Sequence, residues 1–130
     1  MNMKIKLTSV FVDDQKKAIE FYMKVLGFVK KSDFTAGKFR WLTVVSPEEP
    51  NGTALVLEPN ENPAARSYQE SVFNQGIPTT MFFVEDIHKE YQRLKGLGVR
   101  FTKPPTKTTG STIAVLDDTC GNLIQITQLG

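Results

Sequence analysis

The chain is poor in the residues that most often carry metal and nucleophilic chemistry. Its 130 residues include one cysteine, Cys120, and one histidine, His88. A single cysteine excludes an internal disulfide and a zinc site built from several cysteines. A single histidine excludes a site with two histidines and one carboxylate within this chain. Because no histidine is close to Cys120 in the sequence, we expect a structural thiol, and we expect His88 to be a solvated helix residue.

An excess of charge and a long apolar run are also missing. The formal net charge of +2 is spread along the chain, with no cluster of Lys and Arg interleaved with aromatic residues. That pattern argues against a nucleic-acid partner, and no run is long enough to span a membrane. The N-terminal MNMKIKLTSVFVDD is interrupted by polar residues, so it predicts a first strand and no signal peptide. We therefore expect a cytoplasmic protein with no membrane partner.

Two stretches of the sequence repeat each other. VFVDDQKKAIEFYMKVLGF covers residues 10–28, and FFVEDIHKEYQRLKGLGVRF covers residues 82–101. Each has an apolar segment predicted to be a strand, then an acidic pair, an amphipathic segment and a Leu-Gly pair near its end. The acidic pair is expected to cap a helix, and the glycine to end it. A repeat at half the chain length predicts a duplicated architecture.

The remaining periodicity extends this repeat into two similar modules. Each half is predicted to contain a strand, a helix and three further strands, within one domain of residues 1–130. Module one covers about residues 4–58, a linker with a short helix covers 59–77, and module two covers about 78–128. The predicted strands lie at residues 4–12, 28–34, 39–45, 53–58, 99–102, 112–116 and 123–127, with another just before the second helix.

Strand alternation divides the side chains into two faces. One face is wholly apolar and is expected to lie under the helices: Val10, Val12, Leu55, Leu57, Phe82, Val84, Ile124 and Ile126. The other mixes apolar with polar groups: Leu7, Ser9, Phe11, Ala54, Val56, Glu58, Thr79, Met81, Phe83, Leu123, Gln125 and Thr127. A mixed face is typical of a small-molecule pocket wall, although any half-solvated sheet alternates in this way.

The doubled unit resembles the vicinal oxygen chelate superfamily, which contains glyoxalase I enzymes, extradiol dioxygenases and bleomycin-resistance proteins. The resemblance covers Lys4 to Gln128, and its most specific marks are VDDQKKAIEFYMKVLGF, TALVLEPN and LDDTCGNLIQITQ. It implies an α+β fold of two tandem βαβββ modules that form a curved mixed sheet around a central pocket. It also implies a homodimer.

In metal-dependent members of that superfamily, four pocket positions supply the ligands. The resemblance places these positions at Leu7, Glu58, Thr79 and Gln125. Leu7 has no donor atom, Thr79 and Gln125 are weak neutral ligands, and a catalytic metal needs about three protein donors. We therefore expect no metal and no other cofactor.

The leading functional expectation is metal-free binding or sequestration of a small molecule. The expected ligand-binding residues are Leu7, Ser9, Phe11, Trp41, Val56, Thr79, Met81, Phe83 and Gln125. Trp41 and Phe83 are expected either to contact a planar ligand or to be ordinary core residues. The net charge of +2 disfavours bleomycin, a cationic ligand.

Two alternatives stay open at this point. The first is a lyase or isomerase, similar to lactoylglutathione lyase, in which Glu58 is the catalytic base, with or without a weakly held metal. In the alternative reading of Glu58, it is a strand-end residue that reaches solvent or an arginine. The second alternative is a dimeric module whose pocket is vestigial.

Overall fold

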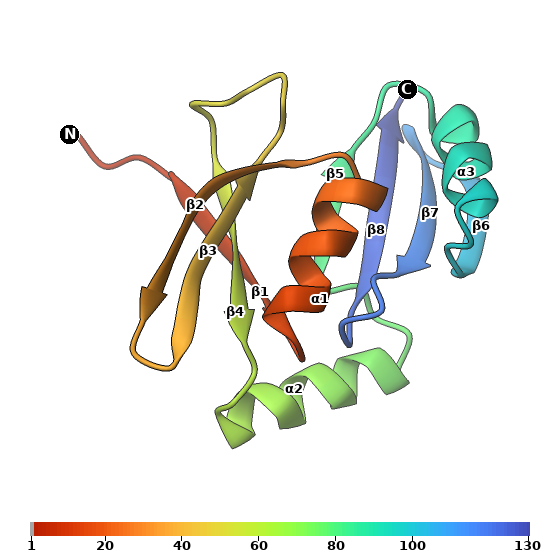
Figure 1. Cartoon of the computed structure of the whole chain (residues 1–130). Helices are drawn as coiled ribbons and strands as arrows, with labels where there is room; N and C mark the ends of the chain where they lie inside the picture. Colours follow the sequence, from red (N-terminus) through yellow and green to blue (C-terminus); the bar gives the residue numbers. More distant parts are fainter. Residues whose placement is uncertain (1) are drawn as a thin grey trace. The chain divides into compact units, whose positions relative to one another are not determined.

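The computed structural model describes residues 2–130, which form two compact units (Figure 1). The first unit ends at Glu61, and the second runs from Asn62 to Gly130. The first unit contains, in order, β1 (Leu7–Val12), α1 (Gln15–Glu20), the π-helical turn η1 (Phe21–Val25), β2 (Val29–Ala36), β3 (Phe39–Val45) and β4 (Ala54–Pro59). The second contains α2 (Pro63–Asn74), β5 (Thr80–Phe83), α3 (Ile87–Gly96), β6 (Phe101–Thr108), β7 (Ser111–Asp117) and β8 (Leu123–Leu129).

Each unit contains one four-stranded mixed sheet, and the two sheets have equivalent strand orders. Sheet A has the order β1-β4-β3-β2, and sheet B has the order β5-β8-β7-β6. In each sheet the first and last strands of the module pair in parallel, and the other pairs are antiparallel. The predicted α+β fold of two βαβββ modules is confirmed. The linker helix α2 belongs to the second unit.

The helix ends follow the local signals in the sequence. Asp14 accepts a hydrogen bond from the Lys17 N–H at 3.1 Å, and Asp86 accepts one from the Lys89 N–H at 3.1 Å. Both acidic residues therefore satisfy a backbone donor that the first turn of a helix leaves unpaired. Gly27, with φ of 90°, ends the first helical segment in the left-handed conformation that glycine adopts without strain.

Three features differ from the sequence prediction. β1 begins at Leu7 and not at Lys4. The predicted helix of the first repeat changes to a π-helical turn at Phe21, in which Phe21 and Tyr22 are buried and Val25 is half-buried. A π turn holds an additional residue, so it rotates the buried stripe. β6 extends through Pro104 to Thr108, which an edge strand tolerates because its outward N–H groups have no partner in the sheet.

The helices pack on one face of each sheet, and the core lies there. α1 contacts β3 and β4, and α3 contacts β6, β7 and β8. Six of the eight residues predicted for this face are buried: Val10, Val12, Leu55, Leu57, Ile124 and Ile126. Phe82 of β5 and Val84, just after β5, are half-buried instead. No helix in residues 2–130 is long and apolar enough to cross a membrane.

Candidate functional site

The face of sheet A opposite α1, here called the far face of sheet A, brings together the site residues predicted in the first unit. The strand register places Leu7, Ser9 and Phe11 of β1 directly beside Ala54, Val56 and Glu58 of β4. Thr43 of β3 continues this row beyond Val56, and it hydrogen-bonds to Ser32 of β2 at 2.6 Å. The far face of sheet A therefore consists of Leu7, Ser9, Phe11, Ser32, Phe34, Trp41, Thr43, Ala54, Val56 and Glu58.

Apolar groups dominate this face, and several are accessible. Leu7 is 49% exposed and Phe34 is 58% exposed, whereas Val56 is buried. Trp41, half-exposed, lies opposite Phe34 in the β2–β3 register, with 6.5 Å between the ring centroids. Isolated exposed apolar residues are ordinary, but a group on one sheet face indicates a contact surface.

Glu58 provides the only ionisable side chain of this face. It is half-buried and lies opposite Phe11 in the parallel register. Within residues 2–61, no cation forms an ion pair with its carboxylate. The nearby Arg40 has a different partner, because its Nε and Nη2 atoms donate to Asp33 at 3.0 and 2.7 Å. The guanidinium, with Lys30, holds the pKa of Asp33 well below its ordinary value.

The corresponding far face of sheet B, opposite α3, gathers the site residues predicted in the second unit. Met81 and Phe83 of β5 lie beside Gln125 and Thr127 of β8. Met81 is 46% exposed and Phe83 is 61% exposed. Thr79, just before β5, donates its backbone N–H to the Leu123 carbonyl at 2.9 Å. On β5, the residue before it and β8, this far face includes Thr79, Met81, Phe83, Leu123, Gln125 and Thr127, and β7 adds Ile113, Val115 and Asp117. Its most exposed apolar residues are Met81 and Phe83.

The four positions that would hold a metal in this fold do not provide a suitable donor set. Leu7 is a hydrocarbon, and the Gln125 amide nitrogen donates to the Thr127 hydroxyl at 3.1 Å. The Thr79 hydroxyl lies 3.5 Å from the Leu123 carbonyl oxygen and is a weak neutral ligand. Glu58 is the one strong donor, whereas a catalytic divalent ion takes about three. Among residues 2–130, no three His, Cys, Asp or Glu side chains form a group that could hold a metal.

Two other reactive residue types lie elsewhere. His88 is exposed in the first turn of α3. Cys120 is completely buried in the turn between β7 and β8. A buried thiol is inaccessible to solutes, and an exposed helix histidine has no fixed orientation toward a substrate. Both positions agree with the structural roles expected from the sequence.

The β7–β8 turn contains a buried polar network that the sequence analysis missed. Asp118 accepts hydrogen bonds from the backbone N–H groups of Cys120 and Asn122, at 2.7 and 3.0 Å, and from the Asn122 amide at 2.8 Å. Gln69 of α2 donates to the Cys120 carbonyl at 3.1 Å and to the Asn122 side-chain oxygen at 3.0 Å. We call Gln69, Asp118 and Asn122 the turn clasp. The sequence DDTCGN predicts the turn itself, but nothing local points to Gln69.

The comparisons with known proteins agree with the fold. The model of the Glyoxalase/Bleomycin resistance protein/Dioxygenase superfamily matches residues 4–126. Uncharacterized protein YurT of Bacillus subtilis (strain 168) is 62% identical over 126 residues, covering 97% of this chain and 99% of the relative. The crystal structure of UcmS2 has a TM-score of 0.84 at 30% identity, covering 98% of each chain.

A second solved structure is described by what it binds. TnmS3, an antibiotic binding protein from Streptomyces sp. CB03234, has a TM-score of 0.78 at 26% identity. The match covers 100% of this chain and 99% of that chain. Together with the repeated βαβββ topology and the family match over nearly all residues, these likenesses show that the chain belongs to the glyoxalase/bleomycin resistance protein/dioxygenase superfamily.

Proposed function

We propose that this protein binds and sequesters a small, flat, largely apolar molecule without using a metal. The observation that carries the proposal is the group of accessible apolar side chains on the two far faces, opposite the helices. Leu7, Phe34, Met81 and Phe83 are each 46% to 61% exposed. Burying such groups against a ligand removes apolar surface from water, which is the main favourable term in binding of this kind.

The predicted site residues divide into four kinds of contact. Phe11, Trp41 and Phe83 offer rings for stacking on a planar ligand, and Leu7, Val56 and Met81 offer aliphatic surface. Ser9, Thr79 and Gln125 provide hydrogen-bonding groups, and Glu58 provides one carboxylate. A mostly apolar surface with a few polar groups is the composition of small-molecule sites in general.

The metal-free part of the proposal is supported by the donor set and by one likeness. Leu7 cannot coordinate a metal, and Thr79 and Gln125 are neutral donors already near other groups. TnmS3, similar over the full length of this chain, is described as an antibiotic binding protein. Binding alone, without a reaction, needs no metal to polarise the ligand.

The single tryptophan makes the proposal directly testable. Trp41 is the only tryptophan of the chain, so its fluorescence reports on the far face of sheet A. We expect one or more members of a panel of fused-ring aromatic compounds to quench or shift this emission saturably. Phe34→Ala, opposite Trp41 on the same far face, should weaken binding roughly twofold to tenfold, which corresponds to the loss of one aromatic contact of about 0.5–1.5 kcal/mol.

The matched control is Tyr68→Ala, which removes an aromatic ring that is 55% exposed on α2, outside both far faces. This variant should bind with unchanged affinity. Absence of any saturable Trp41 response across the panel would refute the proposal, as would equal weakening by Phe34→Ala and Tyr68→Ala.

A second candidate, a lyase or isomerase that uses Glu58 as its base, is favoured by one observation. The Glu58 carboxylate is half-buried beside Phe11 and has no cationic partner within residues 2–61. A carboxylate in such surroundings is free to take a proton from a bound substrate. If this candidate is right, the protein turns over the hemithioacetal of methylglyoxal and glutathione. Glu58→Gln then abolishes that turnover while the Trp41 response to substrate persists.

A further inference from the structure

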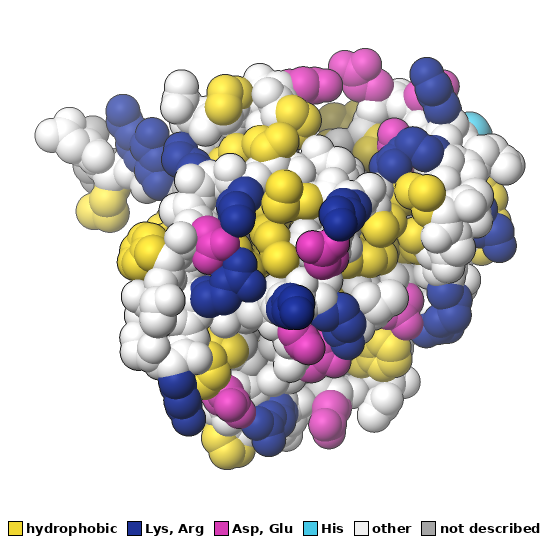
Figure 2. Space-filling model, in the orientation of Figure 1, with side chains coloured by type: hydrophobic (Ala, Val, Ile, Leu, Met, Phe, Trp, Pro, Cys, Tyr) yellow, Lys and Arg dark blue, Asp and Glu magenta, His cyan; other side chains and the backbone are white. Residues whose placement is uncertain are grey.

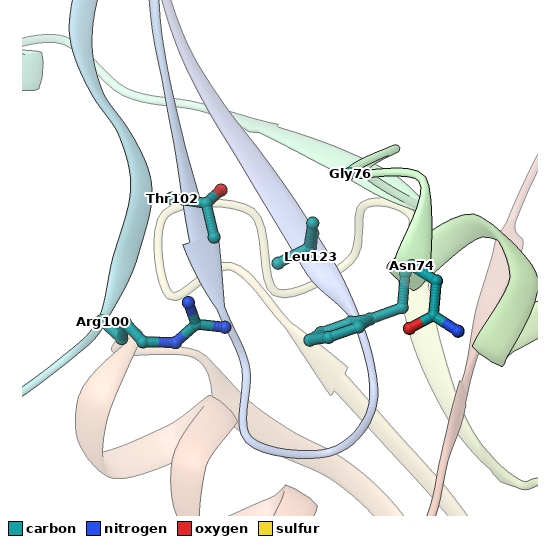
Figure 3. Close-up of a pocket in the computed structure, with 6 residues that line it drawn as sticks. Asn74, Gly76, Arg100, Thr102 and Leu123 are labelled. Atoms are coloured by element: carbon teal, nitrogen blue, oxygen red, sulfur yellow. The ribbon is translucent and has the colours of Figure 1, made fainter.

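The second unit contains a surface depression of about 310 Å³ where β8 begins. Three separate parts of the unit line it: the end of α2 with the turn that follows, the start of β6, and the start of β8. The lining residues are Phe73, Asn74, Gly76, Arg100, Thr102 and Leu123. Figure 3 shows Arg100 and Thr102 on one side of the depression, Asn74 and Gly76 on the other, and Leu123 between them.

Arg100 keeps most of its hydrogen-bonding capacity. Its side chain is 61% exposed and makes one hydrogen bond in the described chain, from Nη2 to Asp117 Oδ2 at 2.8 Å. Arg40, by contrast, uses both Nε and Nη2 on Asp33. The Asp117 carboxylate also accepts the Thr119 N–H at 2.7 Å. Asp117 therefore restrains Arg100 through one nitrogen and leaves the other donors of the planar guanidinium available.

The rest of the lining separates into an apolar floor and a polar rim. Phe73 is half-buried and contributes hydrocarbon surface to the depression, and Leu123, which is 2% exposed, forms its fixed apolar base. Thr102 and Asn74 are exposed and add a hydroxyl and an amide. A flat apolar surface beside a partly unpaired guanidinium fits a ligand with a ring at one end and an anion at the other.

We propose that this depression binds a small planar ring compound that carries a carboxylate. The ring lies against Phe73 and Leu123, and the carboxylate accepts hydrogen bonds from Arg100. The guanidinium is suited to this role because its donors match the spacing of two carboxylate oxygens. A volume near the lower limit of ligand pockets, about 300 Å³, suits a compound of one or two rings. Leu123 also belongs to the far face of sheet B, but none of the six lining residues is among the contacts named for the proposed function.

The Asp117 carboxylate lies beside Arg100 and has the same charge as the proposed ligand, so it provides a second substitution with a predicted effect of opposite sign. Asp117 offsets part of the Arg100 charge, so its carboxylate should oppose an anionic ligand. Asp117→Asn keeps an oxygen for the Thr119 N–H and removes the negative charge. This variant should bind the ligand more tightly, whereas Arg100→Gln should bind it more weakly. A patch that is merely apolar would respond to neither substitution.

The experiment is a ¹H–¹⁵N NMR titration of the full chain with 2-naphthoate, with uncharged 2-naphthamide as the matched compound. Saturable shifts are expected at the amides of Gly76, Thr102 and Leu123 and at the Arg100 Nε–H. Arg100→Gln should weaken naphthoate binding about tenfold, the usual loss for a hydrogen bond to a charged group. Naphthamide should bind to the wild-type chain about as weakly as naphthoate binds to that variant.

Arg100→Lys and Arg40→Gln complete the design. Arg100→Lys keeps the charge and loses the planar donors, so an affinity between wild type and Arg100→Gln is expected. Arg40→Gln, in the first unit, should leave naphthoate affinity unchanged. Equal binding of naphthoate and naphthamide, or no change in Arg100→Gln, would overturn the site. A fused-ring ligand that quenches Trp41 while naphthoate leaves these amides unmoved would overturn this inference alone.

Discussion

At the scale of single residues, the turn clasp makes the strictest demand on side-chain identity. Gly121 lies inside the turn with φ of 98°, a conformation that residues with a Cβ rarely adopt. A Cβ atom built on Gly121 would lie 2.7 Å from Gln69 Nε2. Glycine is therefore required for two separate reasons, backbone conformation and the close approach of Gln69.

We expect Gly121→Ala to lower the free energy of unfolding by roughly 2–4 kcal/mol, from backbone strain of about 1–3 kcal/mol plus displacement of the Gln69 amide. Gly110→Ala is the matched control. Gly110 has φ of 79°, but a Cβ there would meet no atom within 4 Å. Urea unfolding followed by circular dichroism measures both. Equal destabilisation by the two substitutions would show that the Gln69 contact contributes nothing.

At the scale of elements, a glutamine side chain connects a helix to its sheet in each unit. The glutamine lies on the helix in the first unit and on the sheet in the second. In the first unit, Gln15 of α1 donates to the carbonyls of Arg40 at 2.7 Å and Leu57 at 2.9 Å, and accepts from the Arg40 N–H at 3.1 Å. In the second, Gln128 of β8 accepts from the Ile87 N–H at the start of α3, at 2.8 Å. The duplicated modules therefore share a topology but connect helix and sheet through non-equivalent glutamines.

Gln15→Ala should therefore lower the free energy of unfolding by about 2–3 kcal/mol, because it removes three hydrogen bonds worth roughly 1 kcal/mol each. Lys16→Ala, at the exposed neighbouring position, should stay within about 0.5 kcal/mol of wild type. Chemical unfolding monitored by Trp41 fluorescence compares the two variants in the unit that contains the substitution. A Gln15→Ala variant as stable as Lys16→Ala would contradict the bridging role.

The elements also show what a sequence can predict and what it cannot. The caps at Asp14 and Asp86 were predictable because the signal and its partner lie three residues apart. The shared face of Leu7, Ser9 and Phe11 was predictable because alternation is local. The extension of β6 through Pro104 was not, since proline disfavours strands and only the edge position permits it.

For the candidate sites, too, local patterns in the sequence predict neighbouring residues but not contacts between distant segments. Alternation predicted which side chains of β1, β4, β5 and β8 share each far face, and the family resemblance implied the four metal positions. The Arg100 depression was missed because its lining comes from α2, β6 and β8, and no local pattern relates these segments. Gln69 was missed for a similar reason, because its partners Cys120 and Asn122 lie 51 and 53 residues further along the chain.

At the scale of the whole molecule, the surface carries no dominant charge. Figure 2 shows basic and acidic side chains interspersed, with apolar groups exposed between them. This distribution agrees with a formal net charge of +2 and provides little long-range attraction for a strongly charged ligand. Ligand choice therefore depends on local contacts. The single joined domain and the homodimer that the family resemblance implies stay predictions.

The poor metal ligands at the four family positions predict how the whole chain responds to added metal ions. Thermal denaturation with Ni²⁺, Zn²⁺, Mn²⁺ or Fe²⁺ should show no stabilisation that depends on Glu58. A ligand present at 100 times its dissociation constant would stabilise the folded state by about 2.7 kcal/mol, so a bound metal would be detected. A large increase in Tm that disappears in Glu58→Gln would contradict the metal-free assignment. His88→Ala controls for weak surface binding of metal by imidazole.

The turn clasp also determines the boundary at which the two modules can be separated into fragments. Sequence similarity between the modules suggests a boundary near residue 78, where the second repeat begins. The clasp shows that α2 contributes Gln69 to the β7–β8 turn, so the linker helix is part of the second folding unit. A fragment starting at residue 62 retains that amide, whereas one starting at residue 78 loses it. An exchange of modules between relatives should therefore be made at Glu61, with the linker kept on the downstream piece.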